Sequence, residues 1–514
     1  MKKLIAAILV LLLFISVKGQ EILAQKYQLD FTKNLDTTFV EASFSGKLPK
    51  GTITYQFAAT APGTYQTMNI GRFISSFKAF DKRGKEIAIN RLSVNQFEIA
   101  EAKKLEKITY KVAETFDTPV EDYSVYLMCG TSIEDDHVLM NAHTLLGYLT
   151  GYQTSPIQVK PIVPESWTTG SALSKKDGYF QAVDFDELVD SPILSGKLTV
   201  ADTTIANTKV EIFTYSQHDL ITSKMLLKDM SNMLGAAKEF LVTLPVDKYT
   251  FLYFFEEDMS SKGATGAWEH SYSSEYVLTE GEPTKEYMTK VTDIASHEFF
   301  HIVTPLNIHS EIVAQFNFVT PTPSVHLWMY EGVTEWASNI LLFRDGVVAL
   351  EDYIGNAIAT KILVEEKYFD ASWSLKKLSN ESFNAEGSKQ YGNIYYKGSL
   401  VAGLLDIKLL ELSKGKAGLR ELLLSLVKKY GKGNPVSEKN FFEDITKMTY
   451  PEIGEFFNNY VLDNQPLPHK EYLAKIGLML TRDEEGRPSV SKMEEMTDEQ
   501  TLLFNAWLVN MPLE

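Results

Sequence analysis

Apolar and polar positions alternate in short runs between residues 26 and 113, and turn formers such as those at 81–84 separate the runs. The runs are rich in β-branched and aromatic residues, and a period of two is typical of strands that bury one face. We therefore expect an all-β, sandwich-like domain over residues 20–165. Its expected strands lie at 26–31, 39–44, 52–57, 73–80, 86–89 and 107–112.

Helical periodicity replaces this alternation in the second half of the chain. Apolar residues at 294, 295, 299, 300, 302 and 303 predict a largely buried helix over 292–303. Strands followed by helices indicate an α+β fold, with a mixed α/β part at 166–290, a mainly helical domain at 291–470 and a polar tail at 471–514. Further helices are expected at 217–241, 325–343, 350–368, 395–412 and 419–430, and an apolar strand at 248–257.

Residues 1–19 have the pattern of a secretory signal peptide. Two lysines follow the initial methionine, an apolar run covers residues 4–17, and a short polar stretch with small residues follows. The apolar run is shorter than the ~20 residues that span a bilayer, although an uncleaved anchor stays open as the alternative. We expect an exported protein, periplasmic or secreted, with no stable membrane span after cleavage.

Charge and cysteine content narrow the function further. The formal net charge of −17 argues against binding to nucleic acid or to anionic membranes. The single cysteine, Cys129, excludes an internal disulfide and a cysteine-based zinc site.

The segment from His297 to His301 reads His-Glu-Phe-Phe-His. On a helix this HExxH pattern places both imidazoles on one face, one turn apart, where they can hold a zinc ion. Glu298 lies between them and can act as the general base that activates water. A solvated helix with two histidines is the alternative, but burial of the apolar neighbours favours the metal site.

A catalytic zinc site of this kind needs a third protein ligand. Glu331 is the candidate, because it lies in an aromatic, helix-forming surround that leaves room for a loop after His301. Glu335 lies one turn further and can accept a hydrogen bond from a zinc-bound imidazole. His309 and His326 are nearby rivals as ligands. Asp293 precedes His297 by one turn, but an ordinary acidic residue near a helix start is an equal alternative. For Glu335 the alternative is a surface carboxylate.

The chain resembles the glycyl aminopeptidase family of gluzincin zinc peptidases, which are relatives of the aminopeptidase N group. The zinc motif at 297–301 and the segment at 328–334 carry the resemblance. It implies a thermolysin-like, mainly helical catalytic domain with a β portion. Similar stretches span about residues 25–475. The segments at 61–65 and 72–77 resemble the N-terminal β domain of the family, and the segment at 185–192 resembles its central segment.

The resemblance also implies roles for residues outside the zinc motif. Residues 266–270 resemble the exopeptidase motif, in which Glu269 meets the α-ammonium of the substrate and the backbone of Gly266 and Ala267 pairs with the peptide. Tyr395 maps to the tyrosine that stabilises the tetrahedral intermediate, with Tyr391 and Tyr396 as competitors. From the residues alone, an ordinary edge strand with an exposed Glu269 would be the preferred interpretation.

We therefore expect a zinc metalloaminopeptidase with one Zn²⁺ per chain, which removes the N-terminal residue from extracytoplasmic peptides. A preference for Gly or Ala at that position is implied by the resemblance alone. The alternatives are a zinc endopeptidase or oligopeptidase with the same metal site, an exported peptide-binding protein without catalysis, and an interaction protein without metal. Many members of the family carry a PDZ-like module, and too few residues follow Tyr472 to form a complete one.

Overall fold

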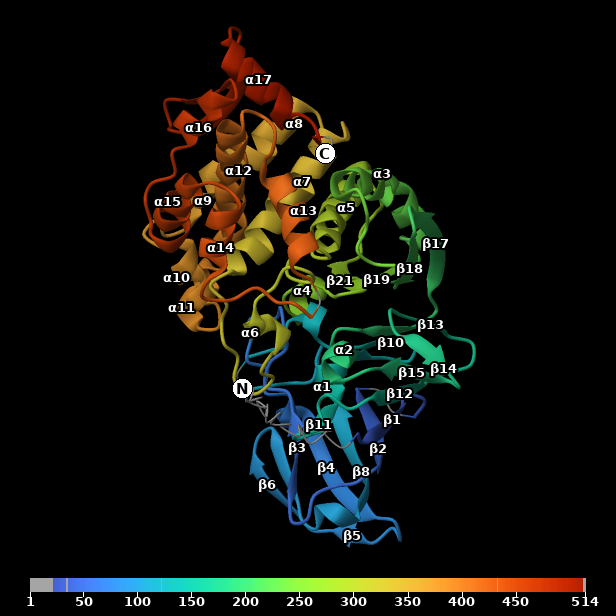
Figure 1. Cartoon of the computed structure of the whole chain (residues 1–514). Helices are drawn as coiled ribbons and strands as arrows, with labels where there is room; N and C mark the ends of the chain where they lie inside the picture. The colour runs from blue at the N-terminus through green and yellow to red at the C-terminus, as the bar shows by residue number, and fades with distance from the viewer. Residues whose placement is uncertain (1–21, 34–35, 122, 432, 512–514) are drawn as a thin grey trace, which may run out of the picture.

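The computed structural model describes residues 22–33, 36–121, 123–431 and 433–511 of the 514-residue chain. The signal peptide expected at 1–19 lies outside the described residues. Strands fill most of the first half of the chain and helices fill the second half, so the predicted α+β class is confirmed (Figure 1). Across the described residues, no helix combines the length and the apolar character needed to cross a membrane.

Two sheets form the N-terminal sandwich. The first has eight strands in the order β14 (Ser174–Lys176), β15 (Tyr179–Ala182), β12 (Ile157–Ile162), β1 (Ala24–Asp30), β2 (Thr37–Ser45), β8 (Leu105–Ala113), β4 (Ile74–Asp81) and β5 (Glu86–Ile87). The second has four strands in the order β11 (Gly147–Leu149), β3 (Ile53–Phe57), β7 (Gln96–Ile99) and β6 (Ile89–Ser93). The larger sheet continues to β15, past the domain boundary expected at residue 165.

Aromatic side chains between the two sheets form the core of the sandwich. Phe57 on β3 meets Tyr110 on β8 edge to face, with ring centroids 5.2 Å apart, and Phe77 on β4 stacks on Phe97 of β7 at 4.4 Å. The buried Tyr110 hydroxyl donates to the carbonyl of Leu145 over 2.9 Å, so its burial leaves no unmet donor. These contacts explain the alternating pattern of the expected strands.

Two further sheets connect the sandwich to the helices. One has the strand order β13 (Thr168–Ser171), β16 (Ile193–Gly196), β10 (His137–Met140) and β9 (Ser132–Ile133). The other has the order β17 (Thr199–Ile205), β18 (Thr208–Ser216), β19 (Lys248–Glu256), β21 (Ser273–Thr279) and β20 (Gly266–Glu269). β19 pairs in parallel with β18 and β21, while the two edge strands, β17 and β20, are antiparallel to their neighbours.

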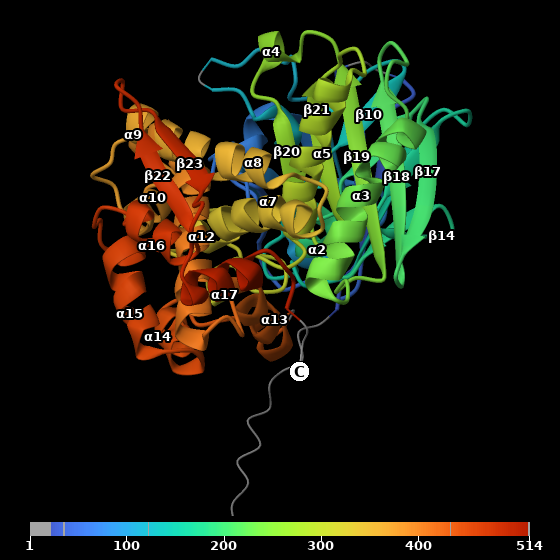
Figure 2. The same cartoon turned by 90° about the horizontal axis from the view of Figure 1, so that it is seen from above.

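Strand β19 is apolar almost throughout because both of its faces are buried. Phe251 and Tyr253 belong to the core shared with α3 (Ser223–Leu241) and α5 (Lys285–Phe300). Leu252 and Phe254 pack on the other side, in a cluster with residues of β10 and β16. Figure 2 shows α3 and α5 lying over this five-stranded sheet.

Helices build the rest of the C-terminal half, around the long α12 (Asn393–Ser413). A π-helical segment, η4 (Trp328–Val333), leads directly into α7 (Thr334–Arg344). The remaining helices of this half are α6 (Glu311–Ala314), α8 (Leu350–Tyr353), η5 (Ile354–Thr360), α9 (Lys361–Tyr368), α10 (Leu375–Asn380), α11 (Ala385–Gln390), α13 (Leu419–Lys429), α14 (Phe441–Met448), α15 (Pro451–Phe457), η6 (Asn458–Leu462), α16 (His469–Lys475) and α17 (Asp498–Trp507). Short helices within the strand-rich half are η1 (Ile70–Phe73), η2 (Ala102–Lys104), η3 (Leu127–Cys129), α1 (Ala142–Leu145), α2 (Phe185–Val189) and α4 (Met259–Lys262).

Several predicted helix ends differ from the structure, and α5 begins at Lys285, seven residues earlier than expected. Helix α3 begins at Ser223, six residues later than expected, because the carboxylate of Glu280 accepts hydrogen bonds from the backbone N–H groups of His218 and Leu220 and holds a turn there. Helix α5 ends at Phe300 rather than at residue 303. After Phe300 the N–H groups of Ile302 and Val303 donate to carbonyls three residues back, over 3.2 and 2.9 Å, so the chain tightens into a turn instead of continuing the α-helix.

The C-terminal tail forms ordered elements. The hairpin of β22 (Leu478–Arg482) and β23 (Pro488–Lys492) precedes α17. Trp507 on α17 is buried against Phe343 and Tyr353, with ring centroids 5.1 and 5.7 Å apart, and its carbonyl accepts a hydrogen bond from Arg344. The apolar residues of the tail are therefore the buried face of a helix that packs on the helical half.

Helices η4 and α12 touch at two glycines. A Cβ added to Gly332 would lie 2.5 Å from Cα of Gly398, and one added to Gly398 would lie 2.8 Å from Cα of Gly332. Both distances are shorter than a carbon–carbon contact, so only glycine fits at either position. The crossing therefore brings Glu331, which precedes Gly332, and Tyr395, about one turn before Gly398, to the same cleft.

We expect Gly398→Ala to lower the free energy of unfolding by about 1–3 kcal/mol, because the added methyl must push two backbones apart. Thermal unfolding followed by calorimetry measures the effect. Gly403→Ala on the same helix is the matched control, since its nearest neighbouring atom would be 3.7 Å away and helical glycine is unfavourable by up to about 1 kcal/mol. Equal melting temperatures of the two variants would contradict the tight crossing.

Candidate active site

Helix α5 presents the HExxH motif to a cleft. The two phenylalanines inside the motif anchor the helix on its other side, where Phe299 meets Tyr249 of β19 at 4.9 Å and Phe300 meets Phe240 of α3 at 5.8 Å. His297 and His301 then lie on the cleft side, with ring centroids 4.9 Å apart. His301 is the residue after the last helical turn and keeps right-handed helical backbone angles, so the one-turn spacing of the motif is preserved.

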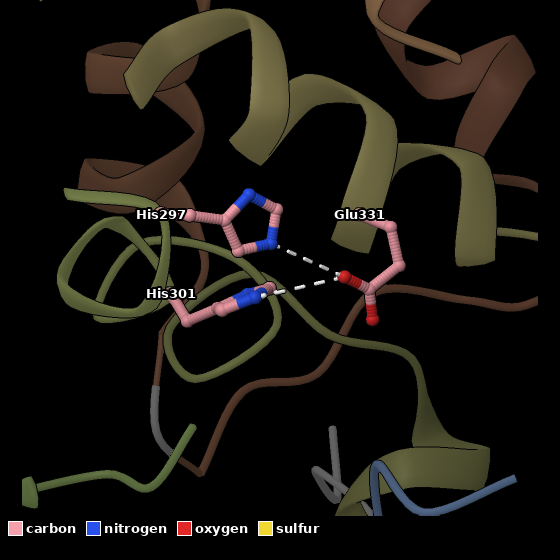
Figure 3. Close-up of side chains that lie close together, drawn as sticks. All are labelled: His297, His301 and Glu331. Carbon is pink, nitrogen blue, oxygen red and sulfur yellow. Dashed lines mark ion pairs between the residues drawn. The ribbon is translucent and has the colours of Figure 1, made fainter. Parts of the chain in front are cut away.

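The structure brings together the three predicted metal ligands. Oε2 of Glu331 lies 3.5 Å from Nε2 of His297 and 3.6 Å from Nε2 of His301 (Figure 3). All three side chains are buried. Their donor atoms all lie within 4.8 Å of one another. The π-helical turn of η4 supplies Glu331, and such turns occur frequently at functional sites.

Hydrogen bonds at the far side of each ring prepare both imidazoles as ligands. Nδ1 of His301 donates to the carbonyl of Thr304 over 2.8 Å, which leaves the lone pair of its Nε2 pointing at Glu331. Nδ1 of His297 bonds to Oε2 of Glu335 over 2.9 Å. Two imidazole nitrogens, each oriented by a further contact, and one carboxylate oxygen fit a divalent metal that prefers N and O donors, such as zinc.

His297 and His301 differ in pKa because their hydrogen-bond partners differ. Burial lowers the pKa of His301 to about 4, so this ring is neutral at pH 7. For His297, burial acts in the same direction, but hydrogen bonds with Glu331 and Glu335 outweigh it and raise the pKa. The carboxylates that stabilise a proton on His297 equally favour a metal cation in that place.

A buried cation supports Glu335. Nζ of Lys361 on α9 lies 2.5 Å from Oε1 of Glu335 and donates to Oγ of Ser399 over 3.2 Å. Burial of Glu335 opposes its charge, but the positive charge of Lys361 outweighs this and lowers the pKa of Glu335. Lys361 cannot be assigned from the sequence, because no spacing rule connects it to a glutamate on another helix.

Glu298 has the surroundings of a general base. Its Oε2 is buried and has no hydrogen-bond partner among the described residues. Burial raises the pKa of Glu298 to about 7. A carboxylate with a pKa near the working pH exchanges protons efficiently with water.

The edge strand β20 carries the three residues expected to bind substrate. Gly266, Ala267 and Glu269 line the same cleft as the metal ligands. The carboxylate of Glu269 lies within 4.8 Å of ligand atoms of Glu298 and His301. Burial raises the pKa of Glu269, and the charges of Glu331 and Glu298 raise it further. Its preferred partner is therefore a cation.

Of the three candidate tyrosines, the structure places Tyr395 and Tyr391 in the cleft. The ring of Tyr395 is 5.6 Å from the ring of His297 and 5.9 Å from that of Tyr391. Burial raises the pKa of Tyr395, so the phenol keeps its proton and can donate it in a hydrogen bond. Tyr396 packs instead against Phe369 at 5.8 Å and does not line the cleft.

The rival ligands lie elsewhere. Nδ1 of His309 bonds to the carbonyl of Pro305, and Nε2 of His326 bonds to the carbonyl of Glu438. Neither belongs to a group of metal-ligating atoms in the part of the chain that the structure describes. Asp293 does line the cleft, and burial raises its pKa to about 6.

The cleft itself has a volume of about 750 Å³ and lies between the two halves of the molecule. One wall comes from the N-terminal sandwich, at Gly63, Thr64 and Tyr65, and another from β20. Helices α5, η4, α7 and α12 supply much of the remaining lining, together with residues at 126–129 and 382–392. This size accommodates a short peptide segment.

Comparison with known proteins agrees with these features. Residues 26–197 match the family domain described as Peptidase M61 N-terminal domain, and residues 290–401 match the one described as M61 glycyl aminopeptidase. Together these matches cover more than half of the chain, and they confirm the family resemblance noted from the motifs. No curated protein matches the sequence.

A solved structure of an aminopeptidase N family protein from Idiomarina loihiensis has the same fold. The TM-score is 0.78 at 19% sequence identity, over 92% of this chain and 82% of that chain. At this level of identity the likeness concerns the fold alone.

We expect Glu335→Gln to weaken zinc binding about 10–100-fold, because the variant removes the charge that orients His297 and leaves Lys361 buried beside a neutral group. Titration with zinc against a competing chelator measures the dissociation constant. Asp293→Asn, another neutralised carboxylate of the same cleft, is the control and should bind zinc nearly as the unaltered protein does. Equal affinities for both variants would contradict the role of Glu335.

Proposed function

The chain is a peptidase of the M61 glycyl aminopeptidase family, and we propose that it is a zinc-dependent aminopeptidase that removes the N-terminal residue from peptides. His297, His301 and Glu331 would hold one zinc ion. When bound, zinc supplies a Lewis acid that polarises the scissile carbonyl and acidifies water. The family match supports the peptidase activity, and the convergence of the three ligands supports the metal.

The position of Glu269 is the observation that carries the exopeptidase proposal. Its carboxylate lies within 4.8 Å of Glu298 and His301. Within one amino acid, the α-nitrogen and the carbonyl carbon are about 2.5 Å apart. The space between Glu269 and the metal ligands therefore suits a single residue, with its ammonium group on Glu269 and its carbonyl beside the histidines. A substrate with further residues before this position would clash with the Glu269 carboxylate.

The other residues divide the chemistry among them. Glu298 takes a proton from the attacking water and passes it to the leaving amine. Tyr395 donates a hydrogen bond to the oxygen that develops negative charge, and one such donor is worth about 3 kcal/mol in acyl chemistry. The backbone of Gly266 and Ala267, on the open edge of β20, pairs with the peptide and aligns it.

Location outside the cytoplasm is part of this proposal. Its support is the pattern of residues 1–19, with basic, apolar and small-residue regions in order. The substrates would then be peptides of the periplasm or of the surroundings.

We expect Glu298→Gln to lower kcat by at least about 100-fold, because glutamine has the shape of glutamate but cannot accept the proton of water. Zinc content, measured by atomic spectroscopy on the same preparation, should stay at one ion per chain. Full activity in the zinc-loaded variant would contradict the assigned base, and loss of zinc would assign Glu298 to metal binding instead.

We expect Glu269→Ala to lower kcat/KM on free aminoacyl substrates about 10–100-fold, because a charge-assisted hydrogen bond to the α-ammonium is lost. The panel contains aminoacyl chromogenic substrates and short peptides, each with a free and an acetylated N-terminus, with and without chelator. The unaltered protein should cleave only the free forms and should stop when chelator removes the metal. Equal cleavage of acetylated peptides, unaffected by Glu269→Ala, would favour the endopeptidase alternative.

A further inference from the structure

A segment of the N-terminal sandwich, residues 61–65, reaches into the catalytic cleft. It follows β3, and the indole N–H of Trp268 on β20 donates to the carbonyl of Pro62 over 3.2 Å. Within the segment, Thr64 Oγ1 donates to the carbonyl of Ala61 over 2.8 Å. The segment is therefore stabilised by its own turn and held against the strand that carries Glu269.

Gly63 lies directly against the carboxylate of Glu269. A Cβ added at this position would lie 2.9 Å from Oε1 of Glu269 and 2.7 Å from Nε1 of Trp268, and the backbone has a φ of +75°. The short distances and the positive φ both require glycine at this position. The sandwich thus forms one border of the place where the α-ammonium of a substrate would bind.

Tyr65 covers the next part of the cleft. Its ring lies 5.5 Å from that of Phe383 and 5.2 Å from that of Tyr391, which in turn neighbours Tyr395. The backbone of Tyr65 has a φ of +45°, which is uncommon for a residue with a side chain and concentrates at functional sites. Burial raises the pKa of its phenol, and the charges of Glu331 and Glu269 raise it further, in agreement with a position near both carboxylates.

The side chain of the first substrate residue branches from the carbon between its ammonium and its carbonyl. Glu269 would hold the ammonium group, and the metal ligands around Glu331 would lie beside the carbonyl. The carbon between them therefore lies in the space that Gly63 and Tyr65 border. The aromatic cluster of Tyr65, Phe383 and Tyr391 closes that space on the side of the helices.

We propose that Tyr65 is the specificity-determining residue of the first-residue pocket, and that its ring restricts the substrate to peptides that begin with Gly or Ala. This inference rests on the proposed aminopeptidase function. It assigns the N-terminal sandwich a part in substrate selection. One excess methylene against a fixed wall changes kcat/KM by about 10–200-fold, which is enough to exclude leucine or phenylalanine.

The test compares Tyr65→Gly with Tyr65→Phe. Glycine removes the ring and also suits the positive φ, so the change relieves the backbone at that position. Phenylalanine keeps the ring and removes the hydroxyl alone. The measurement is kcat/KM of the zinc-loaded protein for Gly, Ala, Leu and Phe chromogenic substrates with free amines, together with the melting temperature of each variant.

We expect Tyr65→Gly to raise the Leu/Gly ratio of kcat/KM at least ~10-fold, and Tyr65→Phe to leave the ratio unchanged. An unchanged ratio in Tyr65→Gly would overturn the inference, and so would an equal change in both variants. If Tyr65→Gly fails to fold, Tyr65→Trp decides the question. A larger ring should lower the Ala/Gly ratio, and an unchanged ratio would again overturn the inference.

These outcomes separate the inference from the proposed function. If the unaltered protein cleaves none of the free-amine substrates, the aminopeptidase proposal fails whatever Tyr65 does. If it cleaves them with a selectivity that Tyr65 does not affect, the aminopeptidase proposal stands and the role of Tyr65 fails.

Discussion

The catalytic half of this protein depends on the concentration of negative charge beside two buried imidazoles. Glu269, Glu298, Glu331 and Glu335 all approach the same cleft. Two carboxylates about 5 Å apart repel each other by roughly 3 kcal/mol at the effective dielectric constant of a protein, and burial adds a desolvation cost. Lys361 offsets part of this charge through Glu335, and a bound divalent metal would offset more. A cation therefore completes the electrostatics of the site as well as its chemistry.

Rigid elements hold these groups in place from several directions. Aromatic contacts fix α5 on β19 and α3, and the π-helical turn of η4 directs Glu331 toward both histidines. The edge strand β20 contributes Glu269, while the sandwich lies against that strand through Trp268 and Pro62. The N-terminal half is thus a wall of the site and not merely a support for the helices.

The sequence was sufficient where local pattern and chemistry coincide. Alternation predicted the sandwich strands, and HExxH with Glu331 predicted a group of ligands that the structure brings together. Lys361 and Tyr65 could not be assigned in this way, because each acts through residues far away in the sequence that only the tertiary fold brings near. Helix ends also depended on such contacts, as the turn held by Glu280 before α3 shows.

The contact between Gly332 and Gly398 has a consequence for how the cleft could change. The spacing of η4 and α12 is set by main-chain atoms in direct contact, so side-chain substitution cannot shorten it, and any substitution at these glycines lengthens it. Variation that alters substrate range is therefore expected to accumulate on the opposite wall, where the sandwich meets the cleft. The wall formed by η4 and α12, which carries Glu331 and Tyr395, would then stay constant during evolution, while residues of the sandwich wall change and alter substrate selectivity.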